Sequence, residues 1–215
     1  MKALLKSLAC FFILCFAVSA FAGSIKEYTA DMVDVKSGKA MQKLAVTPDK
    51  ISSESFNAQG KRQAMAIIRM DQKKMYVITE ENKSYMELPF DKKQFNAADL
   101  SMGMVQIKQE KVGTETVNGY KADKFKTTAT AMGRTFTSFQ WIAPEFDPLP
   151  IRTESDSGGA HEMRNIKTGR PDASLFELPQ GYKRDTQMEQ MMKAMMGGGS
   201  KEDMMKKMMR QQGEK

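Results

Sequence analysis

Short runs of alternating apolar and polar residues, each closed by a turn signal, constrain this chain more than any other feature. Between residues 23 and 184 the apolar residues recur mostly with period two, and turn residues separate runs spaced about 8–12 residues apart. Period two is typical of β-strands, because successive side chains point to opposite faces of a sheet. The expected strands cover residues 28–33, 40–46, 63–70, 74–79, 84–88, 113–117, 120–128, 135–143 and 161–167. We therefore expect roughly ten strands in an all-β sandwich or barrel.

One hairpin and one two-sided strand stand out within this pattern. Asn118-Gly119 is the strongest hairpin signal, because both residues tolerate a positive φ. In residues 63–70, Met65 and Ile67 point one way and small or apolar residues point the other. Such a sheet needs cover on both faces or lines a cavity, and a plain two-layer sandwich core explains the pattern equally well. Helical periodicity in this part of the chain is confined to a short candidate at residues 96–104.

Six segments carry a resemblance to a known family. The first three are Ala66-Ile-Ile-Arg-Met-Asp71, Lys74-Met-Tyr-Val-Ile78 and Lys83-Ser-Tyr-Met-Glu87. The later three are Gly113-Thr-Glu-Thr-Val-Asn-Gly-Tyr120, Trp141-Ile-Ala-Pro144 with Pro150-Ile-Arg152, and Ser174-Leu-Phe-Glu-Leu-Pro-Gln-Gly-Tyr182. In order and spacing they resemble a family of small exported proteins of unknown function, allied to the periplasmic lipoprotein carriers LolA and LolB. The similarity covers residues 28–183.

This resemblance implies a strongly curved antiparallel sheet, an unclosed LolA-like β-barrel, whose concave face is apolar. In the better-known relatives that cavity takes up acyl chains or hydrophobic anchors, and the family has no catalytic residues to transfer. We therefore expect a mainly β fold with a short helical Met-rich C-terminal tail. The expected division is a signal peptide at residues 1–22, a LolA-like β domain at 23–184 and the tail at 185–215.

The first segment has the pattern of a secretory signal. Lys2 and Lys6 precede an apolar run at residues 8–18, and Ala20-Phe21-Ala22 matches the small-x-small cleavage rule. The run is too short to span a bilayer comfortably, since about 20 residues are needed. We expect cleavage after Ala22 and a periplasmic location.

Composition argues against several kinds of chemistry. Cys10 and Cys15 both lie in the expected signal, so the processed chain has neither a disulfide nor a thiol nucleophile. The single His161 cannot build a multi-His metal site, and no Gly-x-Ser-x-Gly elbow presents Ser157 to it. The net charge of +7 is spread over interleaved basic and acidic residues, without the basic stripe that nucleic acids need. We expect no enzyme, no cofactor and no nucleic-acid partner.

The tail is unusually rich in methionine. Its methionines are Met188, Met191, Met192, Met195 and Met196, then Met204, Met205, Met208 and Met209 after the glycines at 197–199. Each set falls on one face of a helix, so the pattern predicts two short amphipathic helices joined by a glycine hinge. Four interpretations stay open: a disordered tail or helices docked on their own sheet, a lid over the cavity, contact with a membrane surface or partner protein, and Cu(I) capture by thioethers.

These patterns together predict a non-enzymatic periplasmic protein that binds a hydrophobic ligand, either a lipid or a lipidated protein. Size and strand position select the candidate ligand-binding side chains Met65, Ile67, Met75, Val77, Phe125, Phe139 and Trp141. A register error of one residue would turn a strand's side chains to the other face. Two alternatives are a Cu(I)-binding protein acting through the tail methionines and an envelope scaffold that contacts another protein through its sheet edge or tail.

Overall fold

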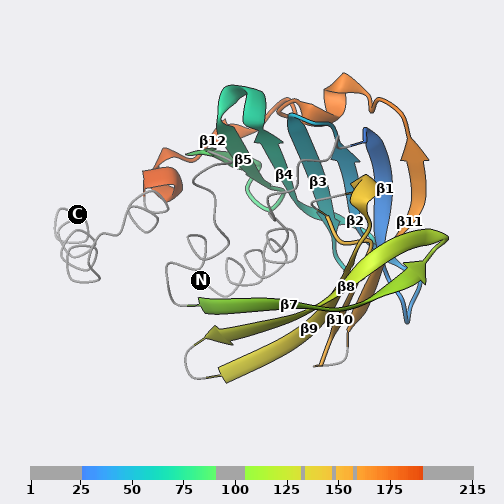
Figure 1. The fold of residues 1–215 in the computed structure, drawn as a ribbon. Coiled ribbons are helices and arrows are strands. Elements are labelled where there is room, and N and C mark those ends of the chain that lie inside the picture. The colour runs from blue at the N-terminus through green and yellow to red at the C-terminus, as the bar shows by residue number, and fades with distance from the viewer. Residues whose placement is uncertain (1–25, 91–104, 132–133, 147–148, 157–158, 191–215) are drawn as a thin grey trace.

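The computed structural model describes residues 26–90, 105–131, 134–146, 149–156 and 159–190, and these form one large sheet (Figure 1). The strands are β1 (Tyr28–Asp34), β2 (Ala40–Val46), β3 (Lys50–Phe56), β4 (Arg62–Arg69), β5 (Lys74–Thr79), β6 (Ser84–Pro89), β7 (Val105–Val117), β8 (Tyr120–Ala131), β9 (Arg134–Ile142), β10 (Arg152–Ser155), β11 (Ala160–Thr168) and β12 (Lys183–Arg184). Three single turns of 3-10 helix are η1 (Met70–Gln72), η2 (Pro144–Phe146) and η3 (Ala173–Phe176). Residues 186–190 are helical.

The strand order is β12-β6-β5-β4-β3-β2-β1-β11-β10-β9-β8-β7. Neighbouring strands pair antiparallel, except that β12 runs parallel to β6. Among the described strands β7 and β12 each have a single neighbour, so the sheet does not close on itself. Figure 1 shows its two halves, β1–β6 and β7–β9, curving toward each other through β10 and β11. The expected fold, a strongly curved and unclosed antiparallel sheet, is confirmed.

Most expected strands are present with shifted ends, and a few were not predicted. The strands β2 and β5 have the predicted bounds, and the hairpin turns at Asn118 (φ 51°) and Gly119 (φ 82°) as predicted. The unpredicted elements are β3, β10, β12 and the first half of β7. The expected signal peptide, the helix candidate at residues 96–104 and the tail beyond residue 190 lie outside the described residues.

Each face of the β1–β6 half carries its own hydrophobic cluster. Tyr28, on what we call the inner face, contacts Phe146 of η2 edge-on, with ring centroids 5.0 Å apart. The inner cluster also includes Val46, Ile51, Ile68, Met75 and Leu88. The outer cluster comprises Ala45, Met65, Ile67, Ile78 and Phe176. Figure 1 shows residues 169–190, here named the C-terminal strap, along the side of this half that faces away from β7–β9.

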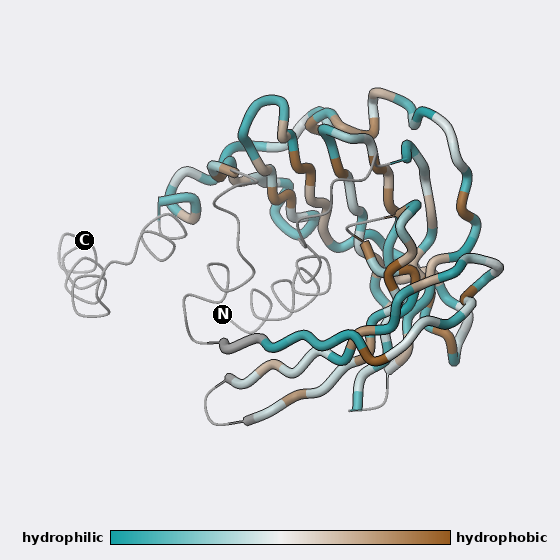
Figure 2. The backbone as a smooth tube through the Cα atoms, viewed as in Figure 1, coloured by the Kyte–Doolittle hydropathy of each residue, from teal (hydrophilic) through white to brown (hydrophobic). Residues whose placement is uncertain are grey.

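The second half of the sheet is more polar than the first. Figure 2 shows apolar residues concentrated in the β1–β5 strands and hydrophilic residues along β7. Residues 108–116 of β7 are all exposed, including Val112 at 46%. Strand β7 is thus a polar edge, and the hydrophobic core belongs mainly to β1–β6 and to the turn around Phe146.

Candidate functional site

The inner face of β2–β6 has no formal charge. Residues paired directly across neighbouring strands share a face, so the strand register defines three parallel rows of inner side chains. The apolar row is Val46, Ile51, Ile68, Met75 and Leu88, the middle row is Leu44, Ser53, Ala66, Val77 and Met86, and the polar row is Gln42, Ser55, Ala64, Thr79 and Ser84. None of these side chains is a carboxylate, an ammonium or a guanidinium group.

Every charged residue of the same five strands lies on the outer face. They are Lys43, Lys50, Glu54, Arg62, Arg69, Lys74 and Glu87. Several of them hold the C-terminal strap: Arg69 pairs with Glu177 at 3.2 Å, and Glu87 pairs with Arg184 at 3.6 Å. The ammonium group of Lys50 lies 6.0 Å from the ring centre of Phe176. The outer charges therefore serve contacts within the chain.

The strap also covers the apolar part of the outer face. Phe176 is 3% exposed and packs in one cluster with Met65, Ile67 and Ile78. Asp172 begins η3 by accepting a hydrogen bond from the backbone N–H of Ser174 at 2.8 Å, as N-terminal caps of helices do. Further along, β12 adds two residue pairs to the edge of β6. The outer face is thus closed by the chain's own C-terminal segment.

An ion cluster around Glu80 anchors the middle of the strap. The Glu80 carboxylate accepts hydrogen bonds from Arg62 Nε at 2.7 Å, from Tyr182 Oη and from Lys83 Nζ. Burial alone would raise the pKa of Glu80, but the hydrogen bonds from Lys83, Tyr182 and Arg62 outweigh it and lower the pKa to about 2. The carboxylate therefore stays ionised and holds Tyr182 against the end of β4.

The seven predicted ligand-binding side chains do not share one face. Met75 and Val77 lie on the inner face, whereas Met65 and Ile67 lie on the outer face beneath the strap. In the other half of the sheet, Phe139 pairs across from Lys126, and Trp141 from Lys124, on one face. Phe125 pairs across from Gln140 on the opposite face. Met75 and Trp141 are nevertheless buried in the inner cluster, and Val77 and Phe139 pack against it. Ligand binding by the set stays a prediction.

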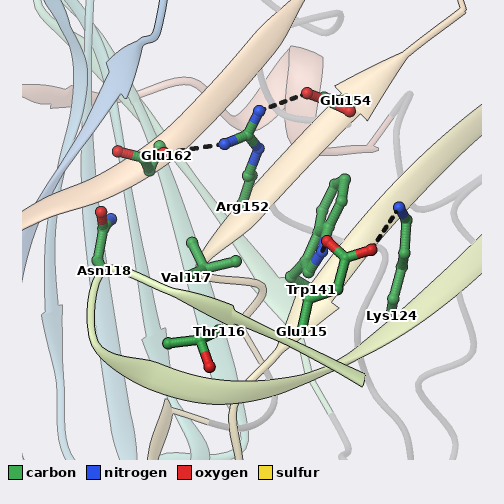
Figure 3. Close-up of a pocket in the computed structure, with 9 residues that line it drawn as sticks. All are labelled: Glu115, Thr116, Val117, Asn118, Lys124, Trp141, Arg152, Glu154 and Glu162. Atoms are coloured by element: carbon green, nitrogen blue, oxygen red, sulfur yellow. Dashed lines mark hydrogen bonds and ion pairs between the residues drawn. The ribbon is translucent and has the colours of Figure 1, made fainter. Parts of the chain in front are cut away.

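A separate polar pocket of about 330 Å³ lies at the turn end of the β7–β8 hairpin (Figure 3). Its lining residues are Glu115, Thr116, Val117, Asn118, Lys124, Trp141, Arg152, Glu154 and Glu162. The indole Nε1 of Trp141 donates to Glu115 Oε2 at 2.8 Å, and Lys124 Nζ lies 4.7 Å from the indole ring centre. Arg152 lies 5.3 Å from the same ring. The pocket thus has a single buried indole ringed by charged groups.

The charged groups of this pocket are engaged with one another. Glu115 accepts from Lys124 Nζ at 2.8 Å, and Arg152 pairs with both Glu154 and Glu162. The hydrogen bond from Lys124 and then that from Trp141 lower the pKa of Glu115. At the hairpin tip, Asn118 Nδ2 donates to the backbone oxygen of Met163 in β11 at 2.9 Å. These contacts fix the turn end of the hairpin against β10 and β11.

Within the described part of the chain, no group of three or more His, Cys, Asp or Glu side chains is placed to hold a metal ion. The same residues include no helix with the length and hydropathy needed to cross a membrane. His161 lies on β11 across from Asp34, and Ser157 is outside the described residues, so the structure does not test the couple between them.

The uncharged polar row of the inner face is not predicted by the sequence patterns described above. Gln42 and Ser55 lie directly across from each other on β2 and β3, and they are 5% and 9% exposed. Selection of large apolar side chains could not find them. The usable signal is the alternation, because the charged residues of β2, β3, β5 and β6 and Arg69 of β4 fall on the face that lacks these two residues, and Arg62 joins them through the register shift at the start of β4.

A family model described as a domain of unknown function (DUF4412) matches residues 21–147. The chain belongs to this family. The matched residues include β1–β9 and η2, and thus both halves of the curved sheet. A comparison with curated proteins found no match.

Several solved structures are similar to this DUF4412 protein at low identity. A structure of PNGF-II is 12% identical with a TM-score of 0.49 and aligns with 79% of this chain, which covers only 34% of PNGF-II. An uncharacterized conserved protein from Thermus thermophilus is 12% identical, with a TM-score of 0.45 and coverage of 84% and 98% of the two chains. The lipoprotein LppX of Mycobacterium tuberculosis is 13% identical, with a TM-score of 0.33 and coverage of 80% and 95%.

Proposed function

We propose that this protein is a non-enzymatic binding protein of the bacterial envelope, and that residues 23–184 take up a hydrophobic ligand on the inner face of β2–β6. The ligand is a lipid or the lipid anchor of a modified protein. One observation carries the proposal: the charged residues of five consecutive strands all lie on the outer face, and the inner face has none. A soluble sandwich core explains an apolar face as well, but this face belongs to a sheet that curves and stays open.

The apolar row, whose side chains are buried in the inner cluster, spans about the length of an extended acyl chain. It crosses five strands from Val46 to Leu88, and neighbouring strands lie about 4.8 Å apart, so its ends are about 19 Å from each other. Removing a methylene from water contributes about 0.8 kcal/mol, so a ten-carbon chain gains about 8 kcal/mol before the entropy losses of binding. Micromolar affinity corresponds to about 8 kcal/mol net, so a ligand held by hydrophobic contact alone needs a chain longer than ten carbons to offset those losses.

The location follows from the first segment, whose charged start, short apolar run and small-x-small end are the features of an export signal. Contact of the Met-rich tail with a membrane surface, a lid role for it and Cu(I) binding by it stay predictions.

Binding of Nile red, an uncharged apolar fluorophore, tests the proposal on the purified protein freed of bound lipid by organic extraction and refolding. Val77 and Tyr76 are neighbours on β5, both half-buried, and they point to the inner and outer faces. We expect Val77→Lys to weaken Nile red binding by about tenfold, since it places a charge among apolar side chains. Tyr76→Lys adds the same charge to the outer face and should leave affinity within about twofold, provided that thermal melting shows both variants folded.

Native mass spectrometry of protein purified without detergent gives an independent readout. Added mass that organic solvent removes and that fragments as lipid supports the proposal. Bare protein together with no Nile red binding overturns it. Equal loss of binding in the two lysine variants, both folded, overturns the assignment to the inner face.

A further inference from the structure

The inner face changes character along its strands. The apolar row, ending at Val46 on β2, has only hydrocarbon and thioether side chains, and the middle row mixes Leu44 and Val77 with Ser53. The polar row presents an amide and three hydroxyl groups at Gln42, Ser55, Thr79 and Ser84. Four residues separate the first row from the third, which is about 13 Å along an extended strand.

The side chains of the polar row can form hydrogen bonds, but none of them is charged. Thr79 Oγ1 lies 3.1 Å from Ser84 Oγ and donates to Asn82 Oδ1 at 2.8 Å, so this end of the row is a connected hydroxyl–amide network. The other end has Gln42 across from Ser55, both more than nine-tenths buried. A buried polar group is tolerated where it finds a hydrogen-bonding partner, whereas an ionised group needs a counter-charge as well. The row consists of hydroxyl, amide and methyl side chains and carries no counter-charge.

The charged side chains of β2–β6 do not face the polar row. On β4, Arg62 points to Glu54, Glu80 and Tyr182, and Arg69 points to Asp71 and Glu177, all on the outer side. A phosphate or carboxylate seated at the polar row would therefore find no counter-charge among the side chains of β2–β6. Such a group would have to project past the row into the turns at the strand ends.

From this zoning we infer that the ligand is an amphiphile with an uncharged, hydrogen-bonding head group, such as a glycerol ester, a glycoside or an amide. The inference rests on the proposed function and refines it. The acyl chain lies across the apolar row, and the head group meets Gln42 and Ser55 at the polar row.

Competition among three ligands that share one acyl chain tests the inference. Monopalmitoylglycerol, palmitate and palmitoyl-lysophosphatidylglycerol are compared as displacers of Nile red from the full protein. We expect the glycerol ester to bind about tenfold more tightly than either anion. Gln42→Leu combined with Ser55→Ala should reduce that preference to about twofold or less. Ser52→Ala is the control, because Ser52 is the buried outer-face neighbour on β3 and should leave the preference unchanged.

The possible outcomes distinguish failure of the head-group inference from failure of the proposed function. Equal affinity for all three ligands, or tighter binding of an anion, overturns the uncharged head group and leaves the hydrophobic site standing. An unchanged preference in the folded double variant overturns the placement of the head group at Gln42 and Ser55. Failure of all three ligands and of Nile red to bind overturns the proposed function itself.

Discussion

The two faces of strands β2–β6 are formed by alternate residues of the same strands, yet they differ in charge and in the segments that contact them. The outer face carries all the charges of these strands and is closed by the C-terminal strap through ion pairs and Phe176. The inner face is uncharged, and it grades from a fully apolar row to a row of hydroxyl and amide groups. Because side chains alternate between the faces along each strand, one sheet can have a charged outer face and an uncharged inner face.

This difference suggests a division of labour. Ion pairs and a fitted aromatic side chain give specificity for one partner, the chain's own strap, and so the outer face contributes stability. A face without charges discriminates little among acyl chains, because hydrophobic contact is non-directional. Substitutions on the outer face should therefore affect unfolding, and substitutions on the inner face should affect binding.

The largest effect is expected where the strap packs on the outer cluster. Phe176→Ala removes a ring that is 3% exposed, and losses of buried aromatic rings cost about 3–5 kcal/mol. The measurement is the free energy of unfolding in urea, with Nile red binding in parallel. Affinity for Nile red should stay within about twofold at urea concentrations where the variant is folded.

Leu175→Ala provides the matched control, since Leu175 is the preceding residue of η3 and is 36% exposed. It should cost less than about 1 kcal/mol. If Phe176→Ala and Leu175→Ala destabilise the protein equally, the strap does not close the outer face. If Phe176→Ala abolishes Nile red binding in the folded protein, the two faces are not independent.

A smaller effect is expected from the ion cluster that holds Tyr182. The pKa of Glu80 is lowered from 4.5 to about 2 in the folded protein, so its contribution to stability is present above pH 4.5 and is lost as the pH falls toward 2. Glu80→Gln should lower stability at neutral pH by about 1.5–3 kcal/mol, the range for hydrogen bonds to charged groups. It should also flatten the dependence of the unfolding midpoint on pH in that acid range.

The neighbouring Glu81→Gln is the control for this titration, because Glu81 is exposed at the β5–β6 turn. Its pH profile should follow the unmodified protein. If Glu80→Gln keeps the full loss of stability in acid, other carboxylates cause that loss. The Glu80 cluster would then not be what stabilises the outer face.

Sequence reasoning found the fold because the strands with strong apolar alternation, such as β2 and β5, are predicted by local pattern alone. It missed β3, whose inner face is Ile51, Ser53 and Ser55 and whose apolar signal is therefore weak. It missed β12 because two residues hold no pattern, and their pairing with β6 depends on distant contacts such as that of Tyr182 with Glu80. Tertiary contacts decided these elements, as they commonly do for strands.

The candidate site was harder to predict than the fold. Side-chain size groups Met65 and Ile67 on β4 with Met75 and Val77 on β5. The register across η1 places Met75 opposite Ile68, so the two pairs lie on opposite faces. That register depends on the turn at residues 70–73, where Lys73 adopts a left-handed conformation (φ 53°). A change of one residue in such a turn exchanges the two faces, so side-chain size alone could not assign them.

The smallest effect is expected at the tip of the β7–β8 hairpin, outside both faces of β2–β6. Asn118→Gly keeps a residue that tolerates the positive φ of 51° and removes the hydrogen bond from Nδ2 to the Met163 oxygen. The loss should cost about 0.5–1.5 kcal/mol of unfolding free energy and leave Nile red affinity within about twofold. Trp141, the single tryptophan of the chain, lines the adjoining pocket and reports on it through its fluorescence. A shift in Trp141 emission without loss of Nile red binding would show that the hairpin, like the outer face, contributes to stability and not to binding. Weakened Nile red binding would show that the hairpin is part of the ligand site.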